Sequence, residues 1–130
     1  MRNKAMEEQM ENNRKEQLEA LKVLSDFQDK FIGNTEILIE ELTTVKKDDT
    51  DALLKSVTDS VNWEIGVLNG TLSLINEESE KLSKEDINKA VTNLADALRS
   101  QDDQKIADAL DKELLPMLKK IREAVTVFSK

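Results

Sequence analysis

The sequence predicts an all-α fold: an antiparallel up-down-up-down four-helix bundle with a long first helix and a Pro-kinked last helix. Two observations predict it. Apolar residues recur three and four positions apart through most of the chain, which is the spacing of one face of a helix. The chain has only 3 Gly and 1 Pro, with 35% charged and 38% hydrophobic residues, a mixture typical of helical proteins. Short connections between the expected helices favour antiparallel neighbours.

The first helix is predicted to run to about Lys46. Residues 1–16 are polar, so we expect an N-terminal extension, helical or disordered, ahead of a helical bundle domain at residues 17–130. Gly33 lies within the helix and costs about 1 kcal/mol relative to Ala. A bend or break at Gly33 is therefore the alternative to a continuous helix. The apolar series comprises Leu21, Leu24, Phe27, Phe31, Leu38, Leu42 and Val45.

The second helix has the most regular apolar series, which comprises Leu54, Val57, Val61, Ile65, Leu68, Leu72 and Ile75. Asp48, Asp49 and Asp51 precede or open it, and acidic residues suit a helix N-terminus. We expect Asp49 or Thr50 to be the N-cap. These acidic residues do not follow the ligand order of a calcium-binding EF-hand loop, so capping is the preferred interpretation.

The third helix is shorter and is predicted to end near Ser100. Ser83, with Asp86 three residues later, resembles a capping box at its start. Its apolar residues are Ile87, Val91, Leu94 and Leu98.

The last helix is predicted to begin after a cap at Asp102 and Asp103. Pro116 interrupts it, removing one backbone donor and clashing with the carbonyl of Lys112. The apolar series keeps its phase beyond Pro116, so we expect the helix to bend near Glu113 rather than end.

Composition excludes several classes of function. The chain has no His and no Cys, which rules out thiol catalysis, disulfides and a ferritin-like di-iron site. We therefore expect no enzyme, no catalytic residues, no metal and no cofactor. The net charge of -8 disfavours nucleic acid and anionic membranes as partners. No apolar run approaches the roughly 20 residues of a membrane span. The polar N-terminus is unlike a signal peptide, so a cytoplasmic protein is expected.

Glu64 is the only acidic residue beside an apolar face, next to Val61, Ile65 and Leu68. We expect an edge-of-core side chain with its carboxylate in solvent. The alternative is a functional acid, whose pKa a pocket would perturb.

The segment from Asn62 to Gly70 is the most unusual in the chain. Gly66 and Gly70 lie one helical turn apart and together cost about 2 kcal/mol relative to Ala. One interpretation is close approach of a neighbouring helix, with Trp63 filling space at its flank. The other is a partner-binding groove anchored on Trp63, since Trp is over-represented among binding hot spots. In the second interpretation Trp63, Gly66, Gly70 and the kinked helix around Pro116 form the groove.

Two segments carry a family resemblance. One surrounds Asn62-Trp63 and runs on from Leu68 to Asn76. The other is the acidic turn ending at Asp103, then Ile-Ala-Asp-Ala-Leu at 106–110 and Glu-Leu-Leu-Pro at 113–116. Over residues 18–128 the chain resembles a family of uncharacterised small helical proteins of Gram-positive bacteria. It departs from them at Lys112, where an aromatic residue is common. The resemblance implies no activity, at most an association with motility or flagellin handling.

The architecture is also similar, as an analogy of fold alone, to flagellar export chaperones, which are small acidic bundles that hold a client helix. We therefore expect a non-enzymatic, chaperone- or adaptor-like module that receives an amphipathic helix of a client protein. The alternative is a structural homo-oligomer, such as a homodimer, that assembles through the long first helix, including Met6, Met10, Leu18 and Leu21. A bundle that binds a small molecule in a cavity is a third interpretation.

Overall fold

The computed structural model describes the backbone of residues 4–129 and the side chains of residue 8 and residues 11–128. The prediction of an all-helical chain with four helices is confirmed, and none of the described residues lies in a strand. The fourth helix comprises several consecutive elements. In chain order the elements are α1 (Lys4–Thr43), α2 (Thr50–Ile75), α3 (Lys84–Ser100), α4 (Asp103–Ala109), the π-helical η1 (Leu110–Leu114), α5 (Leu115–Val125) and the 3-10 helix η2 (Thr126–Ser129).

Helix α1 is continuous through Gly33, so the alternative of a break there is wrong. It includes residues 4–16, and its end at Thr43 comes three residues before the expected Lys46. The hydroxyls of Thr43 and Thr44 donate to carbonyls of the last turn, at 2.9 Å to Ile39 and 2.6 Å to Glu40. The Glu40 carbonyl also accepts from the Thr44 backbone N–H at 3.0 Å, so the Thr44 hydroxyl adds a second bond to an acceptor that the backbone already uses.

The connection to α2 is built differently from the expected cap. Asp49 occupies the N-cap position but its side chain makes no capping hydrogen bond. Instead Thr50 Oγ1 accepts from the Lys47 backbone N–H at 2.7 Å and donates to Glu41 Oε1 at 2.7 Å. Thr50 and Glu41 are both buried, so this bond fixes the end of α1 against the start of α2.

A single side chain organises the connection between α2 and α3. Asn76 Oδ1 accepts from the backbone N–H groups of Lys81 at 2.8 Å and Leu82 at 3.1 Å, and its Nδ2 donates to the Leu82 carbonyl at 2.8 Å. These bonds hold Leu82 where its side chain is buried in the core. One amide side chain thus makes hydrogen bonds to the loop backbone that other backbone groups would otherwise make.

The caps predicted for the third and fourth helices are confirmed. Ser83 Oγ accepts from the Asp86 N–H at 3.3 Å, and α3 ends at Ser100 as expected. Gln101 then adopts a left-handed conformation with φ 53°, which terminates the helix. Asp102 Oδ1 accepts from the N–H groups of Gln104 and Lys105 at 2.9 and 3.1 Å.

The fourth helix contains a π-helical turn just before Pro116. In η1 the hydrogen bonds skip one more residue than in an α-helix, and the Leu115 N–H donates to the Leu110 carbonyl. A π-helical turn is one way to pass a proline, since Pro116 has no N–H and its ring would crowd the carbonyl one turn earlier. The chain therefore stays helical through Pro116.

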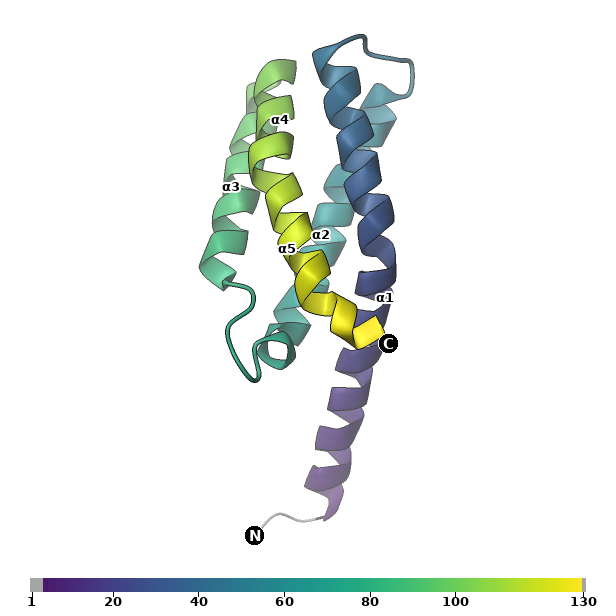
Figure 1. Ribbon diagram of the computed structural model, residues 1–130, viewed down its shortest axis with the longest axis vertical. Helices are drawn as coiled ribbons and strands as arrows, with labels where there is room; N and C mark the ends of the chain where they lie inside the picture. Colours follow the sequence, from purple (N-terminus) through teal and green to yellow (C-terminus); the bar gives the residue numbers. More distant parts are fainter. Residues whose placement is uncertain (1–3, 130) are drawn as a thin grey trace.

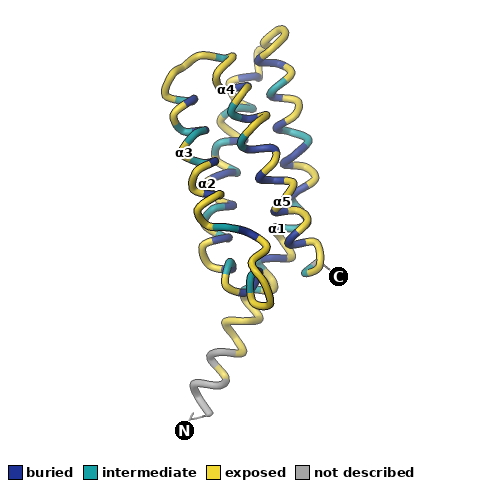
Figure 2. Tube along the Cα trace, turned by 60° about the vertical axis from the view of Figure 1, so that its left-hand side comes forward, coloured by how far each residue is buried: buried dark blue, intermediate teal, exposed yellow. Residues whose placement is uncertain are grey.

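Helix α1 is the centre of the packing. It contacts α2, α4, α5 and η2, whereas α3 packs on α4 and η1 (Figure 1). Buried residues turn inward along the long helices, as Figure 2 shows. Helix α1 extends beyond the remaining helices at its N-terminal end (Figure 1). The core is mostly aliphatic, and its largest fully buried side chains are the aromatic Phe31 and aliphatic residues that include Leu38, Leu118 and Ile121.

Side-chain contacts show how the helices run past one another. Along α1, Arg14 pairs with Glu77, Gln28 with Glu64 and Glu41 with Thr50, so residues further along α1 meet residues earlier in α2. We call the contact surface between α1 and α2 the α1–α2 seam.

Candidate functional site

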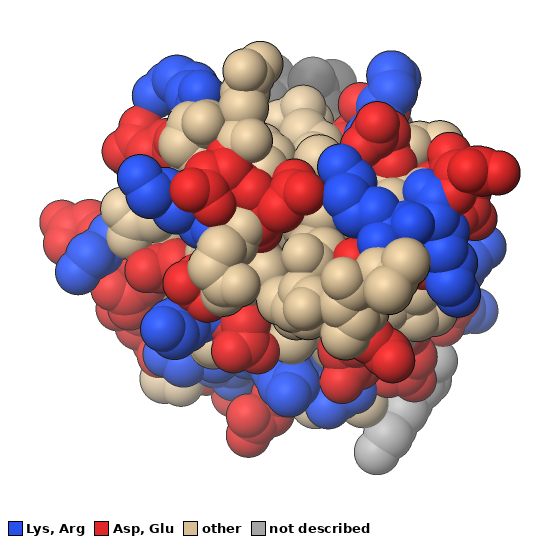
Figure 3. Space-filling model, turned by 90° about the horizontal axis from the view of Figure 1, so that it is seen from above, with Lys and Arg blue, Asp and Glu red and all other residues tan. Residues whose placement is uncertain are grey.

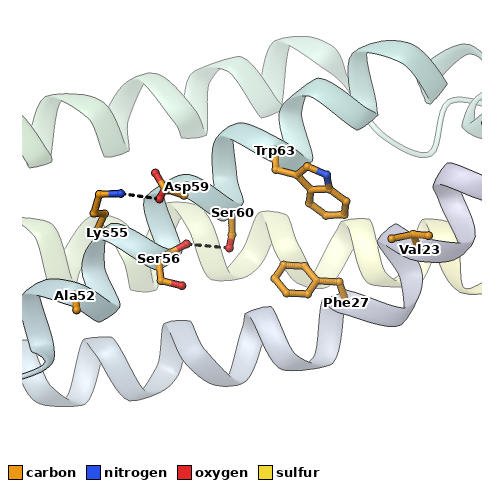
Figure 4. Close-up of a pocket in the computed structure, with 8 residues that line it drawn as sticks. All are labelled: Val23, Phe27, Ala52, Lys55, Ser56, Asp59, Ser60 and Trp63. Atoms are coloured by element: carbon orange, nitrogen blue, oxygen red, sulfur yellow. Dashed lines mark hydrogen bonds and ion pairs between the residues drawn. The ribbon is translucent and has the colours of Figure 1, made fainter.

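An open groove lies over the α1–α2 seam and contains Trp63. It has a volume of about 610 Å³. Figure 4 shows Phe27 of α1 and Trp63 of α2 facing one another, with Val23 one turn away on α1. The groove, which we call the Trp63 groove, is lined by Val23, Phe27, Ala52, Lys55, Ser56, Asp59, Ser60 and Trp63.

The aromatic and aliphatic side chains in this groove are unusually exposed. Trp63 is 42% exposed and Val23 is 57% exposed. The rings of Phe27 and Trp63 meet edge to face, with centroids 5.6 Å apart, a favourable geometry for an aromatic pair. Phe27 also contacts the buried ring of Phe31, at 5.4 Å between centroids. The groove therefore has a fixed aromatic floor that continues into the core.

Three of the four polar side chains of the groove, Lys55, Asp59 and Ser60, are already paired within α2. Lys55 Nζ lies 3.1 Å from Asp59 Oδ2, and Ser60 Oγ donates to the Ser56 carbonyl at 2.9 Å (Figure 4). None of these groups has the arrangement of a nucleophile with an adjacent base. The apolar side chains of the groove therefore lie beside polar groups that bond one another within α2.

Gly66 and Gly70 follow Trp63 on α2 by three and seven residues, which places them along the same side of the helix. Both are exposed, and a Cβ at either position would meet no atom within 4 Å. The interpretation that a neighbouring helix of this chain approaches closely at these glycines is therefore wrong. The Gly70 carbonyl accepts from Gln17 Nε2 at 2.9 Å, which ties the α2 backbone to α1.

Pro116 lies in a different hollow. That hollow has a volume of about 460 Å³ and is lined by residues of the α2–α3 connection, α3, η1 and α5, including Leu82, Ile87 and Met117. It shares no lining residue with the Trp63 groove. The expectation that Trp63 and Pro116 line one groove is corrected accordingly, because the two residues face different pairs of helices.

Glu64 is buried, and the expectation of a carboxylate in solvent is wrong. Its side chain is 1% exposed and faces Gln28 of α1, which is 0% exposed. Gln28 Nε2 donates both to the Leu24 carbonyl, at 2.9 Å, and to Glu64 Oε1. Burial raises the pKa of Glu64 to about 7, against a smaller lowering by the hydrogen bond from Gln28.

Sequence reasoning missed Gln28, and the helical spacing could have revealed it. Buried positions in α1 step by three and four through Leu24, Gln28, Phe31 and Thr35. The interpretation from apolar residues alone used Phe27 in place of Gln28. When the spacing of three and four residues is followed through polar as well as apolar residues, it identifies Gln28, Thr35, Glu64 and Thr71 as core positions.

The surface charges are mixed. Figure 3 shows acidic and basic side chains interspersed on the end of the molecule that carries the α1–α2 connection. At the other end of α2, Arg14 forms a two-pronged ion pair with Glu77, at 3.0 and 3.2 Å, and lowers the pKa of that carboxyl. Among residues with described side chains, no cluster of three or more Asp, Glu, His or Cys could hold a metal ion. None of the described helices combines the length and apolar character that crossing a membrane requires.

Comparison with known proteins places most of the chain in one family. Comparisons with curated proteins and with solved structures gave no match. A family model, described as a domain of unknown function (DUF8042), matches residues 19–124, from the first buried turns of α1 to the end of α5. The chain belongs to the DUF8042 family.

Proposed function

We propose that this protein is a non-enzymatic binding module that receives an amphipathic helix of a partner protein in the Trp63 groove. The exposure of Trp63 beside Val23 and Phe27 is the observation that carries the proposal. Exposed aromatic side chains over a packed floor are typical anchors of protein interfaces. A helix laid in a groove is a recurrent mode of peptide recognition.

The elongated shape of the Trp63 groove and the glycines beyond it suits a partner helix. The lining residues of α2 extend from Ala52 to Trp63, and Gly66 and Gly70 prolong the same side of the helix. The stretch from residue 52 to residue 70 spans about 27 Å at 1.5 Å per residue. A partner helix of about 18 residues would cover it. The flat surface at the two glycines would let the partner backbone approach closely.

The charge of the chain favours a particular partner. With a net charge of -8, the protein attracts a helix whose polar face is basic. The apolar face of that helix would contact Val23, Phe27 and Trp63. We therefore propose an amphipathic helix with a basic polar face as the occupant.

We further propose that the scaffold is an antiparallel up-down-up-down bundle with a bend at Pro116. Support comes from contacts between distant elements. Lys46 approaches Asp103 at 3.5 Å and Asp29 pairs with Arg122 at 3.1 Å, which is the pattern of α1 running against α4 and α5. Asn93 Nδ2 donates to Glu113 Oε1 at 3.1 Å, linking α3 to η1. A cytoplasmic location is proposed with it.

The test is a binding comparison between three proteins: the wild type, Trp63→Ala and Val45→Asp. Val45 is 75% exposed outside the groove, so the last variant is the control for an exposed apolar site. Proteins captured from native lysate are identified by mass spectrometry, and the helical segment of a candidate is then titrated. We expect Trp63→Ala to weaken binding roughly 30-fold, as for an interface hot spot, and Val45→Asp to leave it unchanged. Full affinity of Trp63→Ala, or no segment whose binding needs Trp63, would overturn the proposal.

Self-assembly through the first helix is the second candidate, favoured because α1 extends past the other helices (Figure 1). Leu18 is exposed and Leu21 is buried in the core, whereas the side chains of Met6 and Met10 lie outside the described residues. Light scattering across a concentration series separates the candidates. A dimer that becomes monomeric on deletion of residues 1–16 would support self-assembly, and a concentration-independent monomer would exclude it.

A further inference from the structure

Gln28 and Glu64 form a polar pair at the centre of the α1–α2 seam. Each occupies a position where the helical period calls for an apolar side chain, and each is almost completely buried. Their neighbours along the chain, Phe27 and Trp63, make the aromatic contact of the Trp63 groove. The pair therefore lies directly behind that groove.

The hydrogen bonds of this pair are incomplete in a specific way. Both donors of the Gln28 amide are used, one on the Leu24 carbonyl and one on Glu64 Oε1. Among the described side chains, Gln28 Oε1 and Glu64 Oε2 are buried without a hydrogen-bond partner. Both are acceptors, so neither can satisfy the other when Glu64 is ionised. Unpaired buried acceptors are costly, and the ionised form leaves two of them together.

We propose that Glu64 and Gln28 form a proton-operated latch that closes the α1–α2 seam when Glu64 carries a proton on Oε2. The Oε2–H group donates to Gln28 Oε1 while Gln28 Nε2 donates to Glu64 Oε1. Carboxylic acid and amide are then joined by two hydrogen bonds in a ring, and both unpaired acceptors are satisfied. Release of the proton to solvent leaves a buried carboxylate facing the amide oxygen, and the seam loosens there to admit water. This inference requires no partner in the groove.

Among the described side chains, no charged group near the latch holds Glu64 ionised. Only burial and the Gln28 hydrogen bond shift its pKa. On α1 the nearest charged neighbour of Gln28 is Asp29, whose exposed carboxylate pairs with Arg122 of α5. On α2 the charged groups nearest in the groove, Lys55 and Asp59, are exposed and pair with each other.

Two further sets of ionisable groups with described contacts across the seam lie at its two ends. Glu41, which is buried, bonds Thr50 near the α1–α2 connection. Arg14 and Glu77 form an exposed pair at the opposite end. Neither contributes to the pKa shift of Glu64.

The direction of the pH dependence follows from linkage. The pKa of Glu64 is raised from 4.5 to about 7 on folding, so between these values the folded state holds a proton that the unfolded state has released. The contribution of the latch is complete below pH 4.5, falls as pH rises, and is lost above about pH 7. The ratio of folded to unfolded protein changes on the order of 100-fold across this window.

The first experiment follows the Glu64 carboxyl carbon of the wild type by NMR during a pH titration. Glu64→Gln identifies the signal, because that resonance is absent from the variant. We expect a midpoint near pH 7. A midpoint near pH 4.5 would overturn the latch, and this measurement does not depend on the stability of any variant.

The second experiment measures urea unfolding at pH 5 and pH 8 for the wild type, Glu64→Gln and Glu36→Gln. The amide that Glu64→Gln introduces has a donor where the proton would be, so we expect this variant to lose the wild-type fall in stability and to exceed the wild type at pH 8. Glu36 is exposed on α1 and controls for the change in charge. Subtracting the pH dependence of stability in Glu64→Gln from that of the wild type isolates the latch, because other titrating groups, such as Glu77, are present in both proteins. Identical pH profiles of the wild type and Glu64→Gln would overturn it.

Discussion

The two sides of α1 are built differently. Towards α4, η1 and α5 the contact is an ordinary apolar core, and the buried residues of that fourth helix step by four, four, three and four through Leu110, Leu114, Leu118, Ile121 and Val125. Towards α2 the same periodicity includes polar side chains at Gln28, Thr35, Glu64 and Thr71, and the outer surface carries exposed Trp63 and open glycines. The first side is apolar and closely packed, which stabilises the fold. The second side carries buried polar groups and open glycines at the positions where we propose partner binding and proton binding.

The largest effect on stability is expected on the apolar side. Leu118→Ala removes a completely buried side chain and leaves a cavity, which we expect to cost about 2–5 kcal/mol of unfolding free energy. Urea unfolding measures the loss. Trp63→Ala serves as the comparison, since its half-exposed ring should cost less. Equal losses at both positions would contradict the contrast between the two sides.

A second prediction concerns the polar pair. Gln28→Leu leaves the Glu64 carboxyl buried without its amide partner, and we expect a loss of about 1–3 kcal/mol at pH 8. The pKa of Glu64 should also rise, because the lowering hydrogen bond is gone. In the double variant Gln28→Leu with Glu64→Leu, both polar groups are replaced, so stability should recover and lose its pH dependence in the window described above. A double variant no more stable than the single one at pH 8 would argue against the pair as the origin of the loss.

The third prediction is a gain in stability rather than a loss. Ala at Gly66 or Gly70 adds a Cβ that meets no atom within 4 Å, and it removes the helical penalty of glycine. We expect each change to stabilise the protein by about 1 kcal/mol. Thermal unfolding of the double variant, Gly66→Ala with Gly70→Ala, is sufficient to detect the combined gain in stability. Destabilisation by Gly66→Ala would mean that the glycine serves packing within the chain.

The smallest effect is expected for the exposed ion pair across α1 and α5. Arg122→Ala breaks the 3.1 Å contact with Asp29, and the change should be no more than about 1 kcal/mol because both groups are exposed to solvent. The effect should shrink further in high salt. Unfolding at low and high salt measures both expectations, and a larger, salt-independent loss would show that Arg122 contributes through packing.

Local signals in the sequence predicted the helices well. The caps at Ser83 and Asp102 and the end of α3 at Ser100 depend on residues within a few positions, so the sequence contains them directly. The N-cap of α2 falls at Asp49, one of the two residues expected, but the bond from Thr50 to Glu41 was not predictable because Glu41 belongs to the preceding helix. The burial of Gln28 and Glu64 was not predictable for the same reason, since burial of a polar side chain depends on which residue of another helix faces it.

The candidate site was only partly predictable. Trp63 was identified from its residue type and its glycine neighbours, but its contacts with Val23 and Phe27 depend on the register of α1 against α2. Pro116 was grouped with it on the assumption that the last helix borders the same groove. Packing across the whole molecule decides which helices border the same groove. The spacing of residues within one helix carries no information about this.

The most direct test of the account compares stability and partner binding in one variant, Gly66→Ala with Gly70→Ala. Stability is measured by thermal unfolding, and binding by titration of the partner segment whose capture requires Trp63. The account predicts a higher unfolding midpoint together with binding weakened at least about tenfold, because the added methyl groups occupy the surface that a partner helix approaches. A more stable variant that binds with the affinity of the wild type would contradict it.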